Sequence, residues 1–273
     1  MPRCVFITGA SSGLGAALAA HYAREGATLG LVARRADALQ TVAARLSAPT
    51  AIYPVDVADR AALRAAADDF LGRHGTPDIV IANAGVSVGT LGAEDEDLPV
   101  LERVLRTNVV GLAATLAPFV APMRSRGTGA LAGIASIAGL RGLPGAGAYS
   151  ASKAAAITWL ESLRVELRGS GVSVVTICPG FIDTPMTRVN RYAMPFLLPA
   201  DEPLPEPEVA DELGDARHER DDACPVRRRR VAPPDGVDET QWTTLARSAR
   251  GSPLGRPGGL KGAGSATSAA GVR

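Results

Sequence analysis

The stretch Thr8-Gly9-Ala10-Ser11-Ser12-Gly13-Leu14-Gly15 follows an apolar run, residues 3–8, and precedes an alanine-rich segment. Its glycines are spaced G-x3-G-x-G, which predicts a tight turn between a buried strand and the helix that follows. Backbone amides at the start of such a helix can bind the pyrophosphate of a dinucleotide. We expect Gly9 to permit the turn, Gly13 to let a phosphate approach, and Gly15 to let helix and strand pack closely. Glycines also end strands for steric reasons alone, so the loop by itself is a moderate signal.

Strand-like and helix-like segments alternate through the first 200 residues. The strand-like runs are apolar on both faces, and alanine- and leucine-rich segments lie between them. This order predicts a doubly wound α/β fold, in which helices cover both faces of a parallel sheet. The expected strands are residues 3–8, 28–33, 51–55, 78–82, 130–135 and 172–178; helices are expected to begin near Gly13, Asp59 and Tyr149 and to end at Gly26, Gly75 and Gly171.

Composition limits the class of protein. The chain has 273 residues, 46% of them hydrophobic, and a formal net charge of +1. This charge provides no field that would attract polyanions, so we expect no nucleic-acid or membrane-surface partner. Uncharged stretches such as residues 127–140 are shorter than the roughly 20 residues of a membrane span. The N-terminal apolar stretch is too short for a signal peptide, and we therefore expect a soluble protein.

The cysteines indicate the compartment. Cys4, Cys178 and Cys224 are odd in number and far apart, and no CxxC pair occurs in the sequence. We therefore expect neither a metal site nor a redox couple. A reduced, cytoplasmic location fits this pattern best.

Composition changes near residue 200. Residues 201–273 contain ten Leu, Val, Ile, Phe and Met residues together, with eight Pro, nine Gly, thirteen acids and eleven bases. Apolar residues of these types make up about 14% of the stretch, below the roughly 20% that marks disordered chains. We expect a folded domain over residues 1–200 and a disordered tail over 201–273. The acids mixed into the tail argue against a nucleic-acid arm.

The end of the second expected strand bears on the choice of dinucleotide. In folds of this class, an acidic residue about 20 positions after the glycines binds the ribose 2′-hydroxyl of NAD. This chain instead has Arg34 and Arg35, 19 and 20 positions after Gly15. Two guanidinium groups suit a 2′-phosphate by charge and geometry. The sequence thus predicts NADP(H) as cofactor; NAD(H) is the alternative if the two arginines are merely solvated at a helix start.

A Tyr-x3-Lys pair stands near the start of a long helical pattern. Tyr149 and Lys153 are four residues apart, which places both side chains on one face of a helix. Chance gives such a pair in about 3% of chains of this composition, so the motif needs support. Lys153 is the only lysine among the eighteen basic residues before position 201. Lysine is a compact cation that can lose its proton, so a chemical role explains its presence here better than a solvated surface position does.

The pair suits acid–base catalysis. A phenol with a pKa of about 10 is a poor base at neutral pH, but an adjacent ammonium favours the phenolate. Tyr149 can then exchange a proton with a substrate oxygen. Ser136 closes the fifth expected strand, at the carboxyl edge where ligands of such folds bind, and its hydroxyl can hold the same oxygen. A serine in this place is also an ordinary cap or turn residue.

Together these motifs resemble the short-chain dehydrogenase/reductase family, from Val5 to about Met186. The family has a Rossmann fold, and nearly all of its motifs occur here in order. Residues that match its cofactor site are Gly9, Ser11, Ser12, Gly13, Leu14, Gly15, Asp56, Val57, Asn83, Ala84, Gly85, Pro179, Gly180, Ile182 and Thr184; Asn108, Ser136, Tyr149 and Lys153 match its catalytic tetrad.

The resemblance implies hydride transfer between a nicotinamide ring and a ketone or secondary alcohol, with Tyr149 as general acid or base. Lys153 would bind the nicotinamide ribose and lower the tyrosine pKa. Ser136 would polarise the substrate oxygen, and Asn108 would hold a water of the proton relay. The implied partner is a small carbonyl or alcohol substrate.

After Thr184 the family supplies a substrate-covering segment, a seventh strand and a last helix, and Met186 is an expected apolar residue of the covering segment. Residues 181–200 begin the segment that covers the substrate in this family, but from Glu202 its seventh strand and last helix have no counterpart. A shift of reading frame would explain the unrelated tail, and a conventional C-terminus encoded in another frame of the coding DNA would test this. We expect no regular seventh strand and an exposed edge at the sixth. Because the missing elements build one of two family interfaces, we expect a homodimer rather than a tetramer.

Two other functions stay open on the sequence. The first is a cofactor-binding chain with little or no turnover, because its C-terminal part is missing. The second is another nucleotide-fold enzyme, such as a methyltransferase or a sugar-nucleotide epimerase. Cofactor binding without turnover on a broad panel of ketones would select the first. A methyltransferase does not need the Tyr149 and Lys153 pair, and an epimerase would carry a larger C-terminal substrate domain.

Overall fold

Six parallel strands form the sheet at the centre of a computed structural model of the chain, which describes residues 2–190, 194 and 196–200. Their spatial order is β3-β2-β1-β4-β5-β6, so the chain begins in the middle, winds outward on one side and then outward on the other. This order confirms the predicted doubly wound, Rossmann-type fold. The strands are β1 (Cys4–Thr8), β2 (Thr28–Ala33), β3 (Thr50–Pro54), β4 (Ile79–Ala82), β5 (Gly129–Ile134) and β6 (Val172–Ile177).

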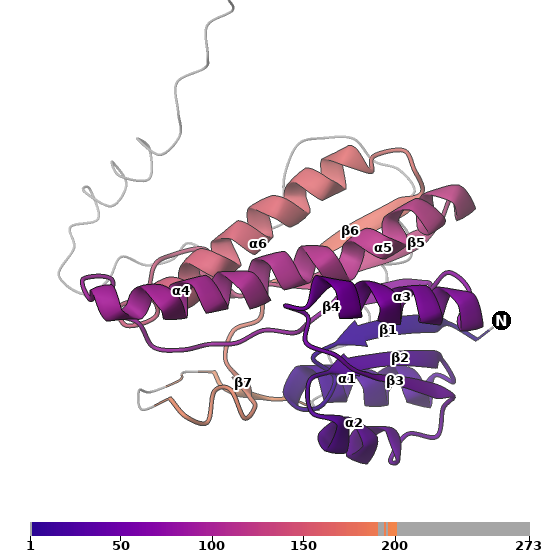
Figure 1. Cartoon of the computed structure of the whole chain (residues 1–273), viewed down its shortest axis with the longest axis horizontal. Coiled ribbons are helices and arrows are strands. Elements are labelled where there is room, and N and C mark those ends of the chain that lie inside the picture. The colour runs from indigo at the N-terminus through magenta and orange to yellow at the C-terminus, as the bar shows by residue number, and fades with distance from the viewer. Residues whose placement is uncertain (1, 191–193, 195, 201–273) are drawn as a thin grey trace, which may run out of the picture. The chain divides into compact units, whose positions relative to one another are not determined.

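Helices cover both faces of this sheet (Figure 1). Side chains of α3, α5 and α6 pack on one face, and side chains of α1 and α2 pack on the other. Short helical turns η1 (Asp95–Asp97), η2 (Arg106–Val110, π-helical) and η3 (Ile137–Gly139) join the larger elements. The helices are α1 (Gly13–Arg24), α2 (Ala36–Ala43), α3 (Arg60–His74), α4 (Leu98–Leu105), α5 (Gly111–Arg126) and α6 (Gly147–Glu166).

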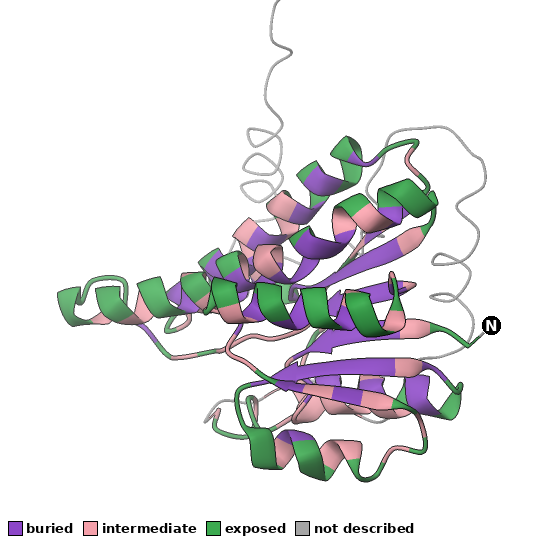
Figure 2. Ribbon diagram, turned by 45° about the vertical axis from the view of Figure 1, so that its right-hand side comes forward, coloured by how far each residue is buried: buried purple, intermediate pink, exposed green. Residues whose placement is uncertain are grey.

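The core forms because the strands carry apolar side chains on both faces. Phe6 of β1 is fully buried, and its ring centroid lies 5.1 Å from that of Phe70 and 4.9 Å from that of Phe119. Its neighbours Val5 and Ile7 belong to the cluster on the opposite face. Figure 2 shows buried residues along the sheet and exposed residues on the outer sides of the helices. Two apolar clusters therefore enclose the sheet.

Two helix signals in the sequence agree with the structure. Asp59 caps α3, because its Oδ1 accepts hydrogen bonds from two backbone amides of the first turn at 3.1 and 3.0 Å. Gly26 and Gly75 follow α1 and α3 with φ angles of 75° and 76°. Glycine adopts this left-handed conformation without steric cost, so both residues let the chain leave the helix.

The predicted start of α6 near Tyr149 agrees with the structure, but its predicted end at Gly171 was wrong. The helix begins at Gly147, two residues before Tyr149, and it ends at Glu166 rather than near Gly171. Gly171 does have a positive φ of 78°, but it lies directly before β6. A side chain there would collide with the backbone of Gly127, so close chain approach explains this glycine.

Among the described residues, β6 is an edge strand of the main sheet and no seventh strand joins it. The chain continues into a separate two-residue pair, β7 (Ile182–Asp183) with β8 (Leu198–Pro199). The expectations for the tail, residues 201–273, lie outside the described residues.

One long helical stretch is apolar enough to cross a membrane by length and composition alone. It runs over Asp95–Arg126 and comprises η1, α4, η2 and α5. Leu112, Leu116 and Phe119 of this stretch are buried in the cluster that α3, α5 and α6 form with one face of the sheet. A core helix of a Rossmann fold passes the same test, so the finding is weak support for a membrane span.

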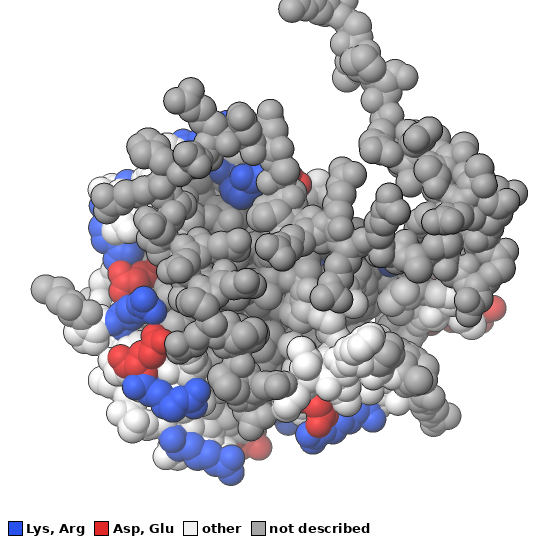
Figure 3. All heavy atoms as spheres, turned by 180° about the vertical axis from the view of Figure 1, so that it is seen from behind, with Lys and Arg blue, Asp and Glu red and all other residues white. Residues whose placement is uncertain are grey.

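Charged side chains are mixed on the surface. Figure 3 shows basic and acidic side chains interspersed along one edge of the face that it draws. Ion pairs such as Arg64 with Asp68, whose Nε and Oδ1 atoms lie 2.9 Å apart, join opposite charges on α3. Charges of both signs are therefore neighbours both along this edge and on α3.

We predict opposite effects of alanine at two glycines. A Cβ atom at Gly30 of β2 would lie 2.6 Å from ring carbons of both Phe6 and Phe70. Gly30→Ala should therefore lower the free energy of unfolding by about 1–3 kcal/mol through overpacking. Gly72 lies within α3 and has no atom within 4 Å of such a Cβ, so Gly72→Ala should raise it by about 0.5–1 kcal/mol. Urea denaturation measures both, and a Gly30→Ala protein as stable as wild type would contradict this packing.

Candidate active site

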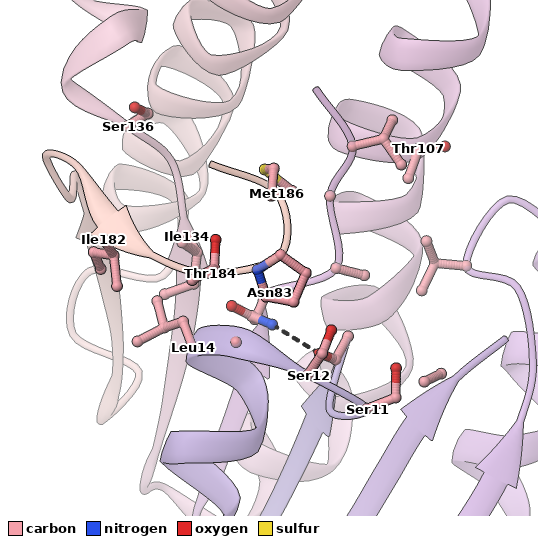
Figure 4. Close-up of a pocket in the computed structure, with 18 of the residues that line it drawn as sticks. Ser11, Ser12, Leu14, Asn83, Thr107, Ile134, Ser136, Ile182, Thr184 and Met186 are labelled. Atoms are coloured by element: carbon pink, nitrogen blue, oxygen red, sulfur yellow. Dashed lines mark hydrogen bonds between the residues drawn. The ribbon is translucent and has the colours of Figure 1, made fainter. Parts of the chain in front are cut away.

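A cavity of about 330 Å³ opens at the carboxyl ends of the strands. The turn between β1 and α1, the ends of β2 to β6 and the first turns of α6 contribute to its wall, as the close-up in Figure 4 shows in part. Of the residues singled out in the sequence, Gly15 and Asn108 do not line it. The others do: Gly9, Ser11, Ser12, Gly13, Leu14, Arg34, Arg35, Asp56, Val57, Asn83, Ala84, Gly85, Ser136, Tyr149, Lys153, Pro179, Gly180, Ile182 and Thr184.

The glycine turn presents helix amides to this cavity. Gly9 and Gly13 have φ angles of 69° and 54°, which side chains rarely allow. Ser12 stands at the N-cap of α1, but its side chain does not cap the helix, and the first turn holds no acid. These amides are therefore available to an anion at the positive end of the helix dipole, and the turn fits a pyrophosphate.

The turn is held in place from the neighbouring strand. Asn83, directly after β4, donates from Nδ2 to the carbonyl oxygens of Thr8 and Gly9 at 3.0 and 3.3 Å. The Thr8 hydroxyl oxygen accepts in return from the backbone amide of Asn83 at 3.2 Å. A side chain at Gly15 would collide with the Gly9 carbonyl and the Asn83 amide group, so this glycine keeps the turn closed.

Arginine side chains and one aspartate lie together at the end of the cavity formed by β2 and β3. Arg34 and Arg35 are exposed at its wall, and Arg35 is the N-cap residue of α2. The nearest guanidinium nitrogen of Arg34 lies 3.9 Å from a carboxylate oxygen of Asp56. The other Asp56 oxygen accepts from the amide of Ala58 at 2.9 Å. An exposed pair at this separation is weak, so Arg34 can exchange Asp56 for a ligand anion at little cost.

Tyr149 and Lys153 both line the cavity from α6. The ammonium of Lys153 lies 5.7 Å from the centroid of the Tyr149 ring. Lys153 is 4% exposed, and its Nζ donates to the Ile134 carbonyl oxygen at the end of β5 at 2.7 Å. Burial lowers the pKa of Lys153 from 10.5 to about 8. The amine is thus mostly protonated at neutral pH and close to its titration range.

Ser136 combines two roles at the end of β5. Its hydroxyl oxygen accepts from the backbone amide of Ala138 at 3.2 Å, so it caps the short helix η3. The hydroxyl also lies 3.4 Å from the carbonyl oxygen of Pro179, in the segment after β6. The same side chain lines the cavity. The geometry of Ser136 is therefore compatible both with capping η3 and with binding a ligand in the cavity.

Asn108 lies behind the cavity, in the π-helical turn η2. Its Oδ1 accepts from the backbone amide of Val86 at 2.8 Å, and its Nδ2 donates to the Val86 carbonyl at 2.9 Å. The second Nδ2 hydrogen bond goes to the Ser152 hydroxyl oxygen, also at 2.9 Å. The side-chain amide therefore joins three segments of the chain instead of facing the cavity.

Several lining residues were not predicted. Val86 and Thr107 are direct neighbours of the predicted residues Gly85 and Asn108, so adjacency was the available signal. Met186, by contrast, was expected as an apolar residue of the substrate-covering segment, and it does line the cavity. No motif marks the remaining ones, which are Ala33, Val55, Ile134, Ala135, Pro185 and Thr187.

Comparison with known proteins identifies the family. The sequence model of the short chain dehydrogenase family matches residues 3–194. The chain belongs to this family. It is 42% identical over 201 residues to an uncharacterized oxidoreductase of Myxococcus xanthus, and the match covers 72% of this chain and 78% of the relative.

Two further proteins to which this chain is similar have named activities or ligands. A 2-dehydro-3-deoxy-L-rhamnonate dehydrogenase (NAD(+)) of Sphingomonas is 37% identical, with 67% of this chain and 74% of the relative covered. The structure of an alcohol dehydrogenase from Thermococcus sibiricus, complexed with 5-hydroxy-NADP, matches with a TM-score of 0.65 at 27% identity; the match covers 73% of this chain and 86% of that one. These relatives support an oxidoreductase; one is named for NAD(+), and the structure of the other holds 5-hydroxy-NADP.

The buried lysine predicts a pH dependence of stability. The pKa of Lys153 is about 8 in the folded chain and 10.5 as the ordinary value, so between these pH values the unfolded chain binds more protons. Stability contributed by this residue must then rise with pH, by about 3 kcal/mol across the window. We expect the free energy of unfolding of the wild type to gain about that much over Lys153→Met between pH 7 and 10.5.

Other groups that titrate in this pH range contribute equally to the wild type and to Lys153→Met, so their effects cancel in the difference between the two proteins. Burial raises the pKa of the Cys4 thiol to about 11, which acts in the opposite direction at high pH but equally in both proteins. Urea denaturation without cofactor at several pH values gives the difference. A constant difference across the window would show that Lys153 is not buried as described.

Proposed function

We propose that this chain is an NADP(H)-dependent oxidoreductase that transfers a hydride between nicotinamide and a ketone or secondary alcohol, with Tyr149 as general acid or base. The observation that carries the proposal is that Tyr149 and Lys153 line the same cavity as the glycine turn. A dinucleotide bound there supplies the hydride or accepts it. The residues of the turn, together with Asn83 to Gly85 and Pro179 to Thr184, would hold it.

Tyr149 would move the proton that accompanies the hydride. During reduction it donates its phenolic proton to the carbonyl oxygen, and during oxidation the phenolate takes the proton of the alcohol. The Lys153 ammonium, 5.7 Å from the centroid of the ring, would favour the phenolate form. The positive end of the α6 dipole acts in the same direction, because Tyr149 lies in the first turn.

Ser136 and Asn108 would complete the site. The Ser136 hydroxyl, at the end of β5 and against the cavity, would donate to the substrate oxygen and keep it near the phenol. The side-chain amide of Asn108 is already occupied by Val86 and Ser152. The relay water that the family resemblance implies would therefore bind the backbone carbonyl of Asn108, in a π-helical turn of a kind often found at functional sites.

The preference for NADP(H) rests on Arg34 and Arg35. Neither stands in a strong ion pair among the described residues, because the contact of Arg34 with Asp56 is 3.9 Å long and exposed. Both guanidinium groups can therefore turn to a 2′-phosphate at the end of β2. No acid follows β2 at the place where the ribose 2′-hydroxyl of NAD would find its acceptor.

We also propose a homodimer in the cytoplasm. Leu98 on α4 and Val110 on η2 are exposed apolar side chains on the helices that flank Asn108, and Val165 is exposed on α6. A partner copy would cover such side chains, as the family interface at these helices would. Light scattering of the purified chain distinguishes a dimer from a monomer or a tetramer.

The first prediction for this function concerns Tyr149→Phe. We expect the variant to bind NADPH with wild-type affinity but to lose about 10²–10⁴-fold in kcat, because only the proton donor is deleted. NADPH oxidation against a panel of ketones and aldehydes measures the rate, and fluorescence titration measures binding. Activity within tenfold of wild type would refute the role of Tyr149. NADPH binding without turnover of any panel member by the wild type would instead select the cofactor-binding chain.

The second prediction concerns the two arginines. In the double variant Arg34→Gln/Arg35→Gln we expect kcat/KM for NADPH to fall about tenfold or more, because the 2′-phosphate loses charge-assisted hydrogen bonds. The value for NADH should change less than twofold, since no phosphate is present at that position. Arg64→Gln, on the exposed side of α3, serves as the control for loss of a surface arginine. Equal kcat/KM of the wild type for both cofactors would overturn the preference.

A further inference from the structure

The helix that carries Tyr149 lacks a cap of its own. Its N-cap residue is Ala146, whose side chain cannot accept a hydrogen bond, and its first turn holds no acid. The cap comes instead from Thr90, which precedes Ala148 by 58 positions in the sequence. The Oγ1 of Thr90 accepts from the backbone amide of Ala148 at 3.1 Å, in the manner of an N-cap side chain.

Thr90 is fixed against the start of α6 by its backbone as well. Its amide donates to the carbonyl oxygen of Gly145 at 3.0 Å, and it forms a parallel bridge with Ala146. The residue is 7% exposed. Any residue at this position can make these backbone contacts. Only the hydrogen bond to the Ala148 amide requires a side-chain hydroxyl.

The other side of the same turn is held through Asn108. The Ser152 hydroxyl donates to the backbone carbonyl of Tyr149 at 2.7 Å and accepts from Asn108 Nδ2 at 2.9 Å. Asn108 in turn holds both backbone groups of Val86, at the other end of the segment that contains Thr90. The chain around Tyr149 is thus bound at the residue before it and at its own carbonyl.

We propose that Thr90 is a positioning residue for Tyr149. Its hydroxyl fixes the first turn of α6, so that the phenol keeps its distance from the Lys153 ammonium and its direction into the cavity. This inference rests on the proposed role of Tyr149 as proton donor. Residues of the glycine turn and Arg34 and Arg35 lie on other elements, so Thr90 acts on the chemical step and not on cofactor binding.

The size of the effect follows from the geometry of proton transfer. Loss of an N-cap frays the first helical turn, and Tyr149 stands in that turn. Displacement of a reacting group by about 1 Å can cost up to about 10²-fold in rate. Lys153 lies one turn further along α6 and keeps its hydrogen bond to Ile134, so the damage should concentrate on the tyrosine.

The experiment compares three substitutions. Thr90→Val keeps the shape of the side chain and removes the hydroxyl, whereas Thr90→Ser keeps the hydroxyl. Thr158→Val makes the same change on the exposed side of α6, where the hydroxyl only bonds back to the Ala154 carbonyl, and serves as the control. We expect kcat of Thr90→Val to fall about tenfold with KM and the NADPH Kd within twofold of wild type. Thr90→Ser should stay within threefold in kcat, and Thr158→Val should equal wild type.

Hydrogen exchange gives a readout that does not need turnover. We expect the amide of Ala148 to exchange about tenfold faster in Thr90→Val than in wild type, while amides near Leu160, later in α6, stay unchanged. If Thr90→Val does not fold, Ser152→Ala takes its place, because it releases the same turn at the Tyr149 carbonyl. The same split between kcat and NADPH Kd is expected for it.

The outcomes separate this inference from the proposed function. Unchanged kcat and unchanged Ala148 exchange in Thr90→Val would overturn the positioning role, as would a loss of kcat that serine does not restore. An equal loss in NADPH affinity and in thermal stability would also overturn it, because that would indicate a general structural role. A wild type without turnover, or an active Tyr149→Phe, contradicts the proposed function, while the exchange experiment still tests the cap.

Discussion

Lys153 is taken out of water between the end of β5 and the first turns of α6, and the charge that it carries there is the constraint on which the rest of the site depends. Burial opposes that charge and lowers the pKa of Lys153 to about 8, against a smaller opposite effect of Cys178. The ammonium also donates a hydrogen bond to the Ile134 carbonyl at 2.7 Å. In surroundings of low dielectric constant a cation acts on a neighbouring phenol with little screening. The centroid of the Tyr149 ring lies 5.7 Å from the Lys153 ammonium, close enough for this interaction.

The parallel sheet explains why distant segments of the chain meet at this lysine. All carboxyl ends of parallel strands lie at one edge, and the strand order reverses direction between β1 and β4. Asn83 and Thr8 join these two strand ends by hydrogen bonds and so fix the glycine turn beside them. The end of β5 contributes twice, since it carries Ser136 and holds Lys153 through Ile134.

The sequence predicted the fold well because burial on both faces of a strand leaves a direct trace in residue type, as at Val5, Phe6 and Ile7. It failed for Gly171 for an equally physical reason. A glycine with positive φ serves the end of a helix and a close approach of backbone alike, and the sequence does not distinguish them. For Asn108 the motif indicated a residue of the site, but the direction of its side chain depends on a π-helical turn that residue type does not specify.

The sequence by itself determined which chemical groups are present and in what order they follow the strands: a glycine turn, two arginines, a serine and a Tyr-x3-Lys pair. These are local properties, set by residue type and spacing. Only the tertiary structure decided that Lys153 is buried, that the Asn108 side chain turns away from the cavity, and that Thr90 caps the helix of Tyr149. Each of these facts depends on packing between segments far apart in the chain, and the free energy of such contacts belongs to no single stretch of residues.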